Sequence, residues 1–352
     1  MTETRGIQEQ VREALSSETP VSIVGGNTKS FLQHSPVGDK LEMKSCQGLV
    51  DYEPSELVIT VRGGTLLMEV EEILNNAGQM LPFEPPRFGP GSTIGGVVAS
   101  GFSGPRRPFT GAIRDFVLGV GLVNGRGEAL HFGGRVIKNV AGYDLSRLMA
   151  GAMGTLGVLT EISLKVVPRP EVERSLRFEF ELGEAITRVN QWLGYPYPIS
   201  ATAWEEGVLT LRLSGSSQGV EAATRKLGGA VAEDLEGYWS SLRDLTHPFF
   251  SGSDPLWRFS LPPATPPLKA PEAPSLVDWG GAQRWVRGRY PSSMMILAAE
   301  EARGWVTLVR GGEGPPEGSV LPDRMITLHR RVKEAFDPQG ILNPGRLPLV
   351  LG

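Results

Sequence analysis

Three glycine-rich corners carry the strongest chemical signal in this sequence. They are GGNTK at residues 25–29, GPGSTIGG at residues 89–96 and GTLG at residues 154–157, and each lies beside an apolar run. Successive main-chain N–H groups in a tight turn form a concave anion site, and Lys29 adds positive charge to the first corner. Glycine suits such a corner because a side chain would hold a phosphate away from the backbone. Together the corners predict a backbone wrapped around an extended, phosphate-bearing ligand.

None of the corners matches a longer nucleotide-binding signature. The chain contains no GxxxxGK[ST] loop, and Ile94 stands where a dinucleotide fingerprint needs its third glycine. The preceding segment, PFEPPRF, is not a strand pattern, so we reject a Rossmann nicotinamide site. Two plainer interpretations stay open. Residues 25–29 taken alone fit a simple turn, and the small residues 95–101 fit close packing as well as cofactor binding.

Other residues that could do chemistry give weaker signals. Arg106, Arg107 and Arg114 could meet a phosphate or a substrate carboxylate, or form a solvated loop. Asp144 is placed to cap a helix, whereas Lys138, in the turn before it, fits an exposed position.

Metal and nucleophile chemistry are not supported by the residue spacings. The four histidines (His34, His131, His247 and His329) are scattered, so we expect no metal site. There is no GxSxG motif, and no catalytic residue can be assigned. Cys46 is the only cysteine, which excludes an intrachain disulfide or a thiolate-held cluster and fits a reducing compartment.

Length and charge set broader limits. A chain of 352 residues is long enough for two domains, and its 45 glycines and 28 prolines predict many turns. The formal net charge of −4 argues against a general affinity for nucleic acid or for an anionic membrane. The charged N-terminal segment is not a signal peptide pattern, and no apolar run approaches the ~20 residues of a membrane span. We expect a cytoplasmic protein that meets a membrane only through another protein.

Hydrophobic periodicity places the corners on regular elements. An opening helix with Ile7, Val11 and Ala14 on one face is followed by a strand at 21–24 that ends at the first corner. We also predict a strand at 57–61, a helix capped by Thr65 and stopped by Gly78, a strand at 116–122 ending at the Asn124-Gly125 hairpin signal, and a strand at 158–166. Pro168 and Pro170 then mark a domain boundary.

Beyond residue 170 the pattern changes to that of a second domain. A strand (175–180), helix (184–193), two strands (201–205 and 208–213), helix (218–227) and strand (229–234) follow in the order of a ferredoxin-like, split βαβ unit. The proline-rich segment 262–274 is expected to be an exposed connector. We predict a strand pair at 294–299 and 305–309, followed by a helix at 322–336.

Taken together, these segments resemble the flavoprotein family of vanillyl-alcohol oxidase and p-cresol methylhydroxylase (PCMH). GGNTK stands where that family has its pyrophosphate loop, and GPGSTIGGVVASGFSGPRR where it has a second FAD-contacting stretch. GTLGVLTEISLKVVP matches its last FAD-domain strand, and FDPQGILNPGR its returning C-terminal tail. The segment KNVAGYDLSRL is similar to the FAD-binding subunits of bacterial glycolate oxidase, also called glycolate dehydrogenase.

The resemblance implies an α+β fold with three parts. They are a PCMH-type FAD-binding domain of two subdomains at 1–170, a smaller ferredoxin-like cap at 171–321, and a C-terminal helix and tail at 322–352 that return to the FAD domain. It also implies a small 2-hydroxyacid substrate, a homologous larger FAD subunit (GlcD-like) and an iron–sulfur subunit (GlcF-like). Electrons would pass to the membrane quinone pool, with peripheral attachment to the inner membrane through those partners.

The expected FAD contacts fall on the corners and the tail. Gly25, Gly26, Asn27, Thr28 and Lys29 are expected at the pyrophosphate, and Thr93, Gly95, Gly96, Ser100 and Gly101 at the ribityl chain and ring. We expect Gly154, Gly157 and Val158 on the adenine side, and Asn343 and Arg346 near the ring. Family members with covalent FAD have a histidine in the first loop, where this chain has Asn27, so noncovalent FAD is expected. The short cap contains only His247, which makes unaided hydroxyacid oxidation doubtful.

Overall fold

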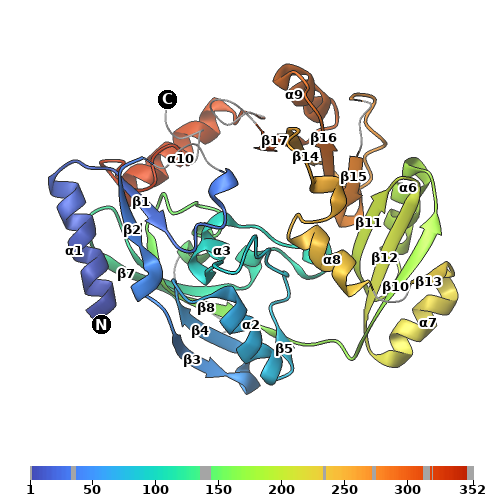
Figure 1. The fold of residues 1–352 in the computed structure, drawn as a ribbon, viewed down its shortest axis with the longest axis horizontal. Helices are drawn as coiled ribbons and strands as arrows, with labels where there is room; N and C mark the ends of the chain where they lie inside the picture. Colours follow the sequence, from blue (N-terminus) through green and yellow to red (C-terminus); the bar gives the residue numbers. More distant parts are fainter. Residues whose placement is uncertain are drawn as a thin grey trace. The chain divides into compact units, whose positions relative to one another are not determined.

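The structure, a computed structural model, describes residues 2–32, 37–134, 144–232, 235–271, 275–311, 318 and 320–346. The chain divides into two compact units (Figure 1). Unit 1 comprises Met1–Ser103, Gly111–Pro168 and Val320–Gly352, and unit 2 comprises Gly104–Thr110 and Arg169–Ser319. This division differs from the expected limits 1–170, 171–321 and 322–352 chiefly at Gly104–Thr110, which groups with unit 2.

Unit 1 is built on a five-stranded antiparallel sheet in the order β3-β4-β8-β6-β7. Its strands are β3 (Leu49–Glu53), β4 (Val58–Arg62), β6 (Val117–Val123), β7 (Ala129–Gly133) and β8 (Val158–Lys165). The helices α2 (Leu67–Asn76) and α3 (Ile94–Ser100) bury apolar side chains in the same core as β4, β6 and β8. Burial of this apolar surface is the main force that fixes α3, and with it the second corner, against the sheet.

A smaller layer of unit 1 carries the first corner and the tail. β1 (Val21–Val24) pairs in parallel with β2 (Asp39–Glu42), and Val21 also forms a parallel bridge with Leu342. The helix α1 (Thr2–Ser16) buries Ile7 and Val11 against this layer. Unit 1 also contains η1 (Ser30–Leu32), η2 (Met43–Ser45), η3 (Pro54–Glu56), β5 (Gln79–Met80), η4 (Ile113–Asp115), α5 (Leu145–Leu148), β9 (Val167–Pro168) and α10 (Asp323–Phe336).

Unit 2 contains an eight-stranded sheet in the order β13-β10-β12-β11-β15-β16-β14-β17, in which each pair of neighbouring strands is antiparallel. In chain order its elements are α4 (Arg107–Thr110), β10 (Val172–Glu179), α6 (Leu182–Trp192), β11 (Ile199–Glu205), β12 (Val208–Gly215), α7 (Ser217–Leu227), β13 (Ala230–Ala232), α8 (Glu236–Arg243), η5 (Pro248–Phe250), β14 (Leu256–Ser260), β15 (Ser275–Asp278), η6 (Trp279–Gly281), β16 (Gln283–Arg287), α9 (Ser292–Glu301) and β17 (Trp305–Arg310).

The first half of this sheet has the predicted ferredoxin-like order. The strands β13-β10-β12-β11 lie as fourth, first, third and second in the chain, with α6 and α7 as the two crossovers. The strands β17-β14-β16-β15 repeat the same order, with α9 as their second crossover and the described residues 261–271 in the connection that corresponds to the first crossover. The two halves therefore join through β11 and β15, the second strand of each.

Two predictions of local structure are wrong. The apolar run Met294–Ala299 forms helix α9 rather than a strand, because only Met295 and Ala299, one helical turn apart, need burial. Methionine and alanine also favour helices. Thr65 does not cap α2, whose N-cap is Leu66, because its hydroxyl accepts a hydrogen bond from the Gly48 amide at 2.9 Å instead.

Candidate cofactor site

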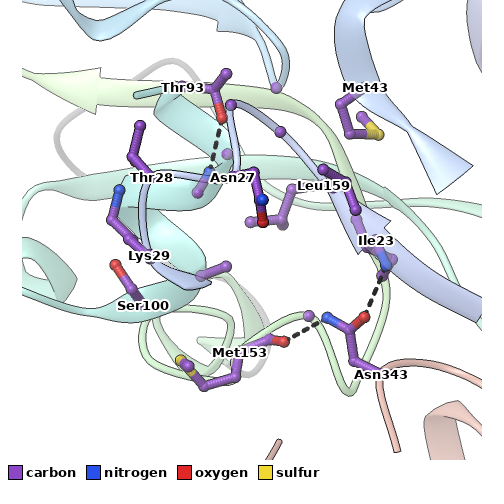
Figure 2. Close-up of a pocket in the computed structure, with 18 of the residues that line it drawn as sticks. Ile23, Asn27, Thr28, Lys29, Met43, Thr93, Ser100, Met153, Leu159 and Asn343 are labelled. Carbon is purple, nitrogen blue, oxygen red and sulfur yellow. Dashed lines mark hydrogen bonds between the residues drawn. The ribbon is translucent and has the colours of Figure 1, made fainter. Parts of the chain in front are cut away.

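A cavity in unit 1, open to solvent and with about 770 Å³ of empty space that includes the solvent at its mouth, lies where four segments converge (Figure 2). They are the loop after β1, the start of α3, the loop that precedes β8, and the C-terminal tail. The described lining residues are Ile23, Val24, Gly25, Gly26, Asn27, Thr28, Lys29, Ser30, Met43, Gly63, Thr93, Gly95, Gly96, Ala99, Ser100, Met153, Gly154, Gly157, Leu159, Asn343 and Arg346.

All the expected FAD contacts except Gly101 and Val158 lie in this lining. Gly101 instead ends α3 in the left-handed conformation at φ 69°, and Val158 is buried in the core beside β1. The sequence reasoning missed the apolar part of the lining, namely Ile23, Met43, Ala99, Met153 and Leu159. Strand alternation from the corners could have found Ile23 and Leu159, but nothing in the sequence places Met43 beside them.

The first corner offers a row of unused main-chain donors. None of the five amides of residues 25–29 donates a hydrogen bond to an acceptor in the described part of the chain. Asn27 is left-handed at φ 54°, which turns successive amides toward one side of the loop. The loop therefore retains the donors that an anion would accept from.

The glycines of this corner are required by close backbone packing. A Cβ on Gly26 would lie 1.4 Å from the carbonyl oxygen of Gly91, and one on Gly25 would lie 2.4 Å from Oγ1 of Thr93. The first and second corners are thus pressed against each other. The structure thus gives Gly25 and Gly26 a packing reason that the expectation of clearance for a phosphate did not include.

Two cations in the lining have no ion pair with a carboxylate among the described residues. Lys29 Nζ donates to Ser92 Oγ at 3.0 Å and lies 5.7 Å from the centre of the Phe88 ring, and desolvation lowers its pKa to about 8. Desolvation also lowers the pKa of Arg346 to about 10. The described residues that line the cavity include no Asp or Glu. Desolvated cations are stabilised by an anion, so the donor set fits a diphosphate.

The start of α3 shapes the wall and is itself fully hydrogen-bonded. Thr93 Oγ1 accepts from the Gly96 amide at 3.2 Å, and the Gly95 amide donates to Gly63 O at 2.7 Å. A Cβ on Gly95 would lie 2.6 Å from that same carbonyl oxygen. The residues of the second corner are small because α3 lies directly against the segment after β4. This close packing keeps that side of the cavity narrow.

Asn343 holds the tail in the cavity wall. Its Oδ1 accepts from the Ile23 amide at 2.7 Å and its Nδ2 donates to Met153 O at 2.7 Å (Figure 2). Its own amide donates to Val21 O at 2.8 Å. One side chain thus ties together β1, the loop before β8 and the tail, so Asn343 positions three walls of the cavity.

A buried ion pair between α10 and the tail helps to hold the tail in this position. Lys333 Nζ pairs with Asp337 and donates to Thr155 O at 2.7 Å and Leu342 O at 3.0 Å. Asp337 also accepts from the amides of Leu342 at 2.8 Å and Ile341 at 3.2 Å. Sequence reasoning missed this pair, although its i, i+4 spacing ahead of the NPGR turn was a usable signal.

The arginines considered as carboxylate ligands are divided between the two units. Arg106 is buried in an ion pair with Glu173, and the Arg107 guanidinium lies 4.4 Å from the centre of the Trp279 ring, both in unit 2. Arg114 belongs to η4 of unit 1. Asp144 caps α5 as expected, by accepting from the Arg147 amide at 3.4 Å. Lys138 and Asn139 lie outside the described residues.

The described residues contain no group of three or more His, Cys, Asp or Glu side chains able to hold a metal. His247 Nδ1 accepts from the Phe249 amide at 3.3 Å, which makes it the cap of η5. Cys46 is buried, and burial raises the pKa of its thiol. In the described part of the chain, no helix has the length and hydropathy needed to span a bilayer.

The fold and the donor set define an FAD-binding protein of the p-cresol methylhydroxylase type. The FAD binding domain family matches residues 1–133, and the family of FAD linked oxidases, C-terminal domain, matches residues 321–347. The structure of p-cresol methylhydroxylase aligns over 97% of this chain and 87% of its own, with a TM-score of 0.71 and 15% identity. That of alkyldihydroxyacetonephosphate synthase aligns over 96% and 73%, with a TM-score of 0.67 and 15% identity.

Relatives in sequence show which family of FAD-binding proteins the chain belongs to. The chain is 45% identical over 345 residues to glycolate oxidase subunit GlcE of Escherichia coli K12, covering 98% of this chain and 97% of that protein. It is 34% identical over 141 residues to glycolate oxidase subunit GlcD of Bacillus subtilis, covering 40% of this chain and 30% of that protein. This chain belongs to the family of the glycolate oxidase subunit GlcE.

Proposed function

We propose that this chain is the FAD-binding subunit of a glycolate, or 2-hydroxyacid, dehydrogenase complex that oxidises glycolate to glyoxylate. Membership of the GlcE family supports this assignment. The structural observation that carries it is the unit 1 cavity, in which five unused amides and two desolvated cations face a lining without carboxylates among its described residues.

The residues present suit noncovalent FAD. We assign the diphosphate to residues 25–29, with Lys29 supplying charge. Thr93, Gly95, Gly96 and Ser100 are assigned to the ribityl chain and ring, Gly154 and Gly157 to the adenine side, and Asn343 and Arg346 to the ring surroundings. The described lining includes no His, Cys or Tyr that could attach a flavin covalently, which supports the expectation drawn from Asn27.

Bound FAD would supply the redox chemistry, as a carrier of electrons between the partner subunits. This chain would hold the cofactor and exclude water from its diphosphate. Arg106 is already paired with Glu173 and the Arg107 guanidinium lies over the Trp279 ring, so we assign neither as a carboxylate grip. We therefore assign hydroxyacid oxidation to a larger GlcD-like subunit and electron acceptance to an iron–sulfur GlcF-like subunit. On this proposal the complex is cytoplasmic and reaches the inner membrane only through those partners.

The test is the absorbance spectrum of the purified chain, with and without glycolate, and with a GlcD-like polypeptide from the same source. We expect the isolated chain to show flavin bands that glycolate leaves unchanged. We also expect the chain to co-purify with the GlcD-like polypeptide. Bleaching by glycolate in the isolated chain would instead indicate a free-standing oxidoreductase. A spectrum without flavin bands, even after incubation with FAD, would indicate a cofactor-free assembly module.

A further inference from the structure

A second cavity of unit 1, open to solvent and with about 1100 Å³ of empty space that includes the solvent at its mouth, lies beside the cofactor cavity. We call it the α10 groove. Its walls come from α5, the loop at 150–156, α10 and the tail at 343–345, and its lining is mostly apolar, including Leu148, Ala150, Leu156, Leu328, Val332 and Pro344. Among the described lining residues, Asn343 alone of the proposed cofactor contacts also lines this groove.

The groove and the cofactor cavity share a thin wall. Asn343 lines both, and the loop before β8 divides its residues between them. Met153 and Gly154 line the cofactor cavity, whereas Ala152 and Thr155 line the groove. A molecule seated in the groove would therefore lie one layer of residues from the cofactor.

Exposed apolar side chains extend the groove along α10. Met325 is 36% exposed and Leu328 is 51% exposed, and across the groove Leu148 on α5 is 39% exposed. With Val332, Met325 and Leu328 form an i, i+3, i+7 stripe, whose inner end packs on the unit 1 core through Val332. A stripe with this spacing beside an apolar groove is the geometry that accepts an amphipathic helix.

The charges on α10 indicate which kind of helix the groove would bind. Arg324, Arg330 and Arg331 are exposed, and none has an ion-pair partner among the residues that the structure describes. Complementary potentials guide association, so the occupant should carry carboxylates beside its apolar face. A bilayer is a poorer candidate because the groove is concave and the chain's net charge is −4.

We propose that the α10 groove is the docking site for an apolar, carboxylate-flanked helix of the iron–sulfur polypeptide. This inference rests on the proposed function, because it assumes a redox partner that gains from a position one wall away from the flavin. The groove then serves both assembly and the short electron path.

The experiment uses this chain co-expressed with the GlcD-like and cysteine-rich polypeptides of the same source. Leu328→Asp and Arg331→Glu are compared with Leu297→Asp, a matched control on α9 whose side chain is 56% exposed. Affinity-tagged complexes are quantified for each polypeptide, and flavin absorbance reports cofactor retention. We expect Leu328→Asp to reduce the bound cysteine-rich polypeptide at least tenfold and Arg331→Glu to reduce it less. Leu297→Asp should leave it unchanged, with flavin occupancy equal in all forms.

The remaining outcomes overturn the inference in distinguishable ways. Retention of the cysteine-rich polypeptide by Leu328→Asp would show that the groove is not its docking site while leaving the proposed function intact. Loss of only the GlcD-like polypeptide would assign the groove to the other subunit. Loss of binding to anionic phosphatidylglycerol vesicles, or of self-association, without loss of the complex would assign it to a membrane or to a second copy. Failure of the unmodified chain to assemble would overturn the proposed complex as well.

Discussion

Lys29 illustrates how single residues prepare the cavity for an anion. Its ammonium has one hydroxyl partner, at Ser92, and desolvation has already lowered its pKa to about 8. A diphosphate placed beside it would raise that pKa again by favouring the charged form. Binding of FAD above pH 8 would then require uptake of a proton.

We expect FAD affinity to fall as pH rises from about 8 toward 9.5, by at most about tenfold per pH unit. Lys29→Met should weaken binding by about 10- to 100-fold, the loss of one charge-assisted hydrogen bond of about 1.5–3 kcal/mol, and should flatten the pH dependence. Lys29→Arg, which stays charged, is the control: it should retain its affinity for FAD, and its affinity should depend less on pH. Fluorescence titration of apoprotein with FAD measures all three. An unchanged slope in Lys29→Met would show that Lys29 does not face the phosphates.

Substitution of Gly26 would not test whether the loop binds a diphosphate. A Gly26→Asp variant would lose FAD whatever the loop binds, because any Cβ there collides with the Gly91 carbonyl. Substitution of the lysine is the sharper experiment, since its side chain lines the cavity and its replacement brings no Cβ into the backbone of the second corner.

At the scale of elements, the C-terminal tail depends on α10. The Lys333–Asp337 pair is buried, whereas Arg225 and Glu221 form an exposed pair with the same i, i+4 spacing on α7. Removing one member of a buried pair leaves an uncompensated charge, and exposed pairs contribute little.

Lys333→Met should therefore lower the unfolding free energy of unit 1 by about 3–5 kcal/mol, and Arg225→Met should change stability by less than about 0.5 kcal/mol. All seven tryptophans (Trp192, Trp204, Trp239, Trp257, Trp279, Trp285 and Trp305) lie in unit 2. Release of FAD on urea titration is thus the measurement for unit 1, and tryptophan fluorescence reports unit 2. Equal losses in the two variants would contradict the role given to the buried pair.

The sequence predicted the corners well because each depends on local chemistry. GGNTK follows a strand, and strand period and glycine content are both visible in the chain. What it could not show are contacts between distant segments. The Gly26–Gly91 approach, the position of Met43 and the links of Asn343 to Ile23 and Met153 depend on how the sheet folds. The helix α9 was missed because a short apolar run does not by itself distinguish helix from strand.

At the scale of the whole molecule, unit 2 contains its own titratable core. Asp278, at the β11–β15 junction where the two halves of the sheet join, accepts from Gln283 Nε2 at 3.0 Å, and its Oδ1 has no hydrogen-bond partner among the residues that the structure describes. Desolvation raises the pKa of Asp278 to about 7, although Gln283 and Arg258 act in the opposite direction.

The folded state therefore binds more protons at Asp278 than the unfolded state does between pH 4 and pH 7. Stability of unit 2 should fall as pH rises through this window, by up to about 4 kcal/mol from this one group, and stay low above it. Asp278→Asn keeps the acceptor for Gln283 and should flatten the dependence, so that the variant is the more stable form at pH 8. Urea unfolding followed by tryptophan fluorescence at several pH values measures this. A variant with the same pH profile as the unmodified chain would rule out Asp278 as the source.

The central claim is that the amides of residues 25–29, with Lys29, hold the diphosphate of FAD. A crystal structure of the chain grown with FAD tests it most directly, through the distances from the phosphate oxygens to these nitrogens. The account predicts several such distances at hydrogen-bond length, about 2.7–3.2 Å, with the Arg346 side chain also facing the cofactor. A flavin bound with its diphosphate away from this loop would contradict it.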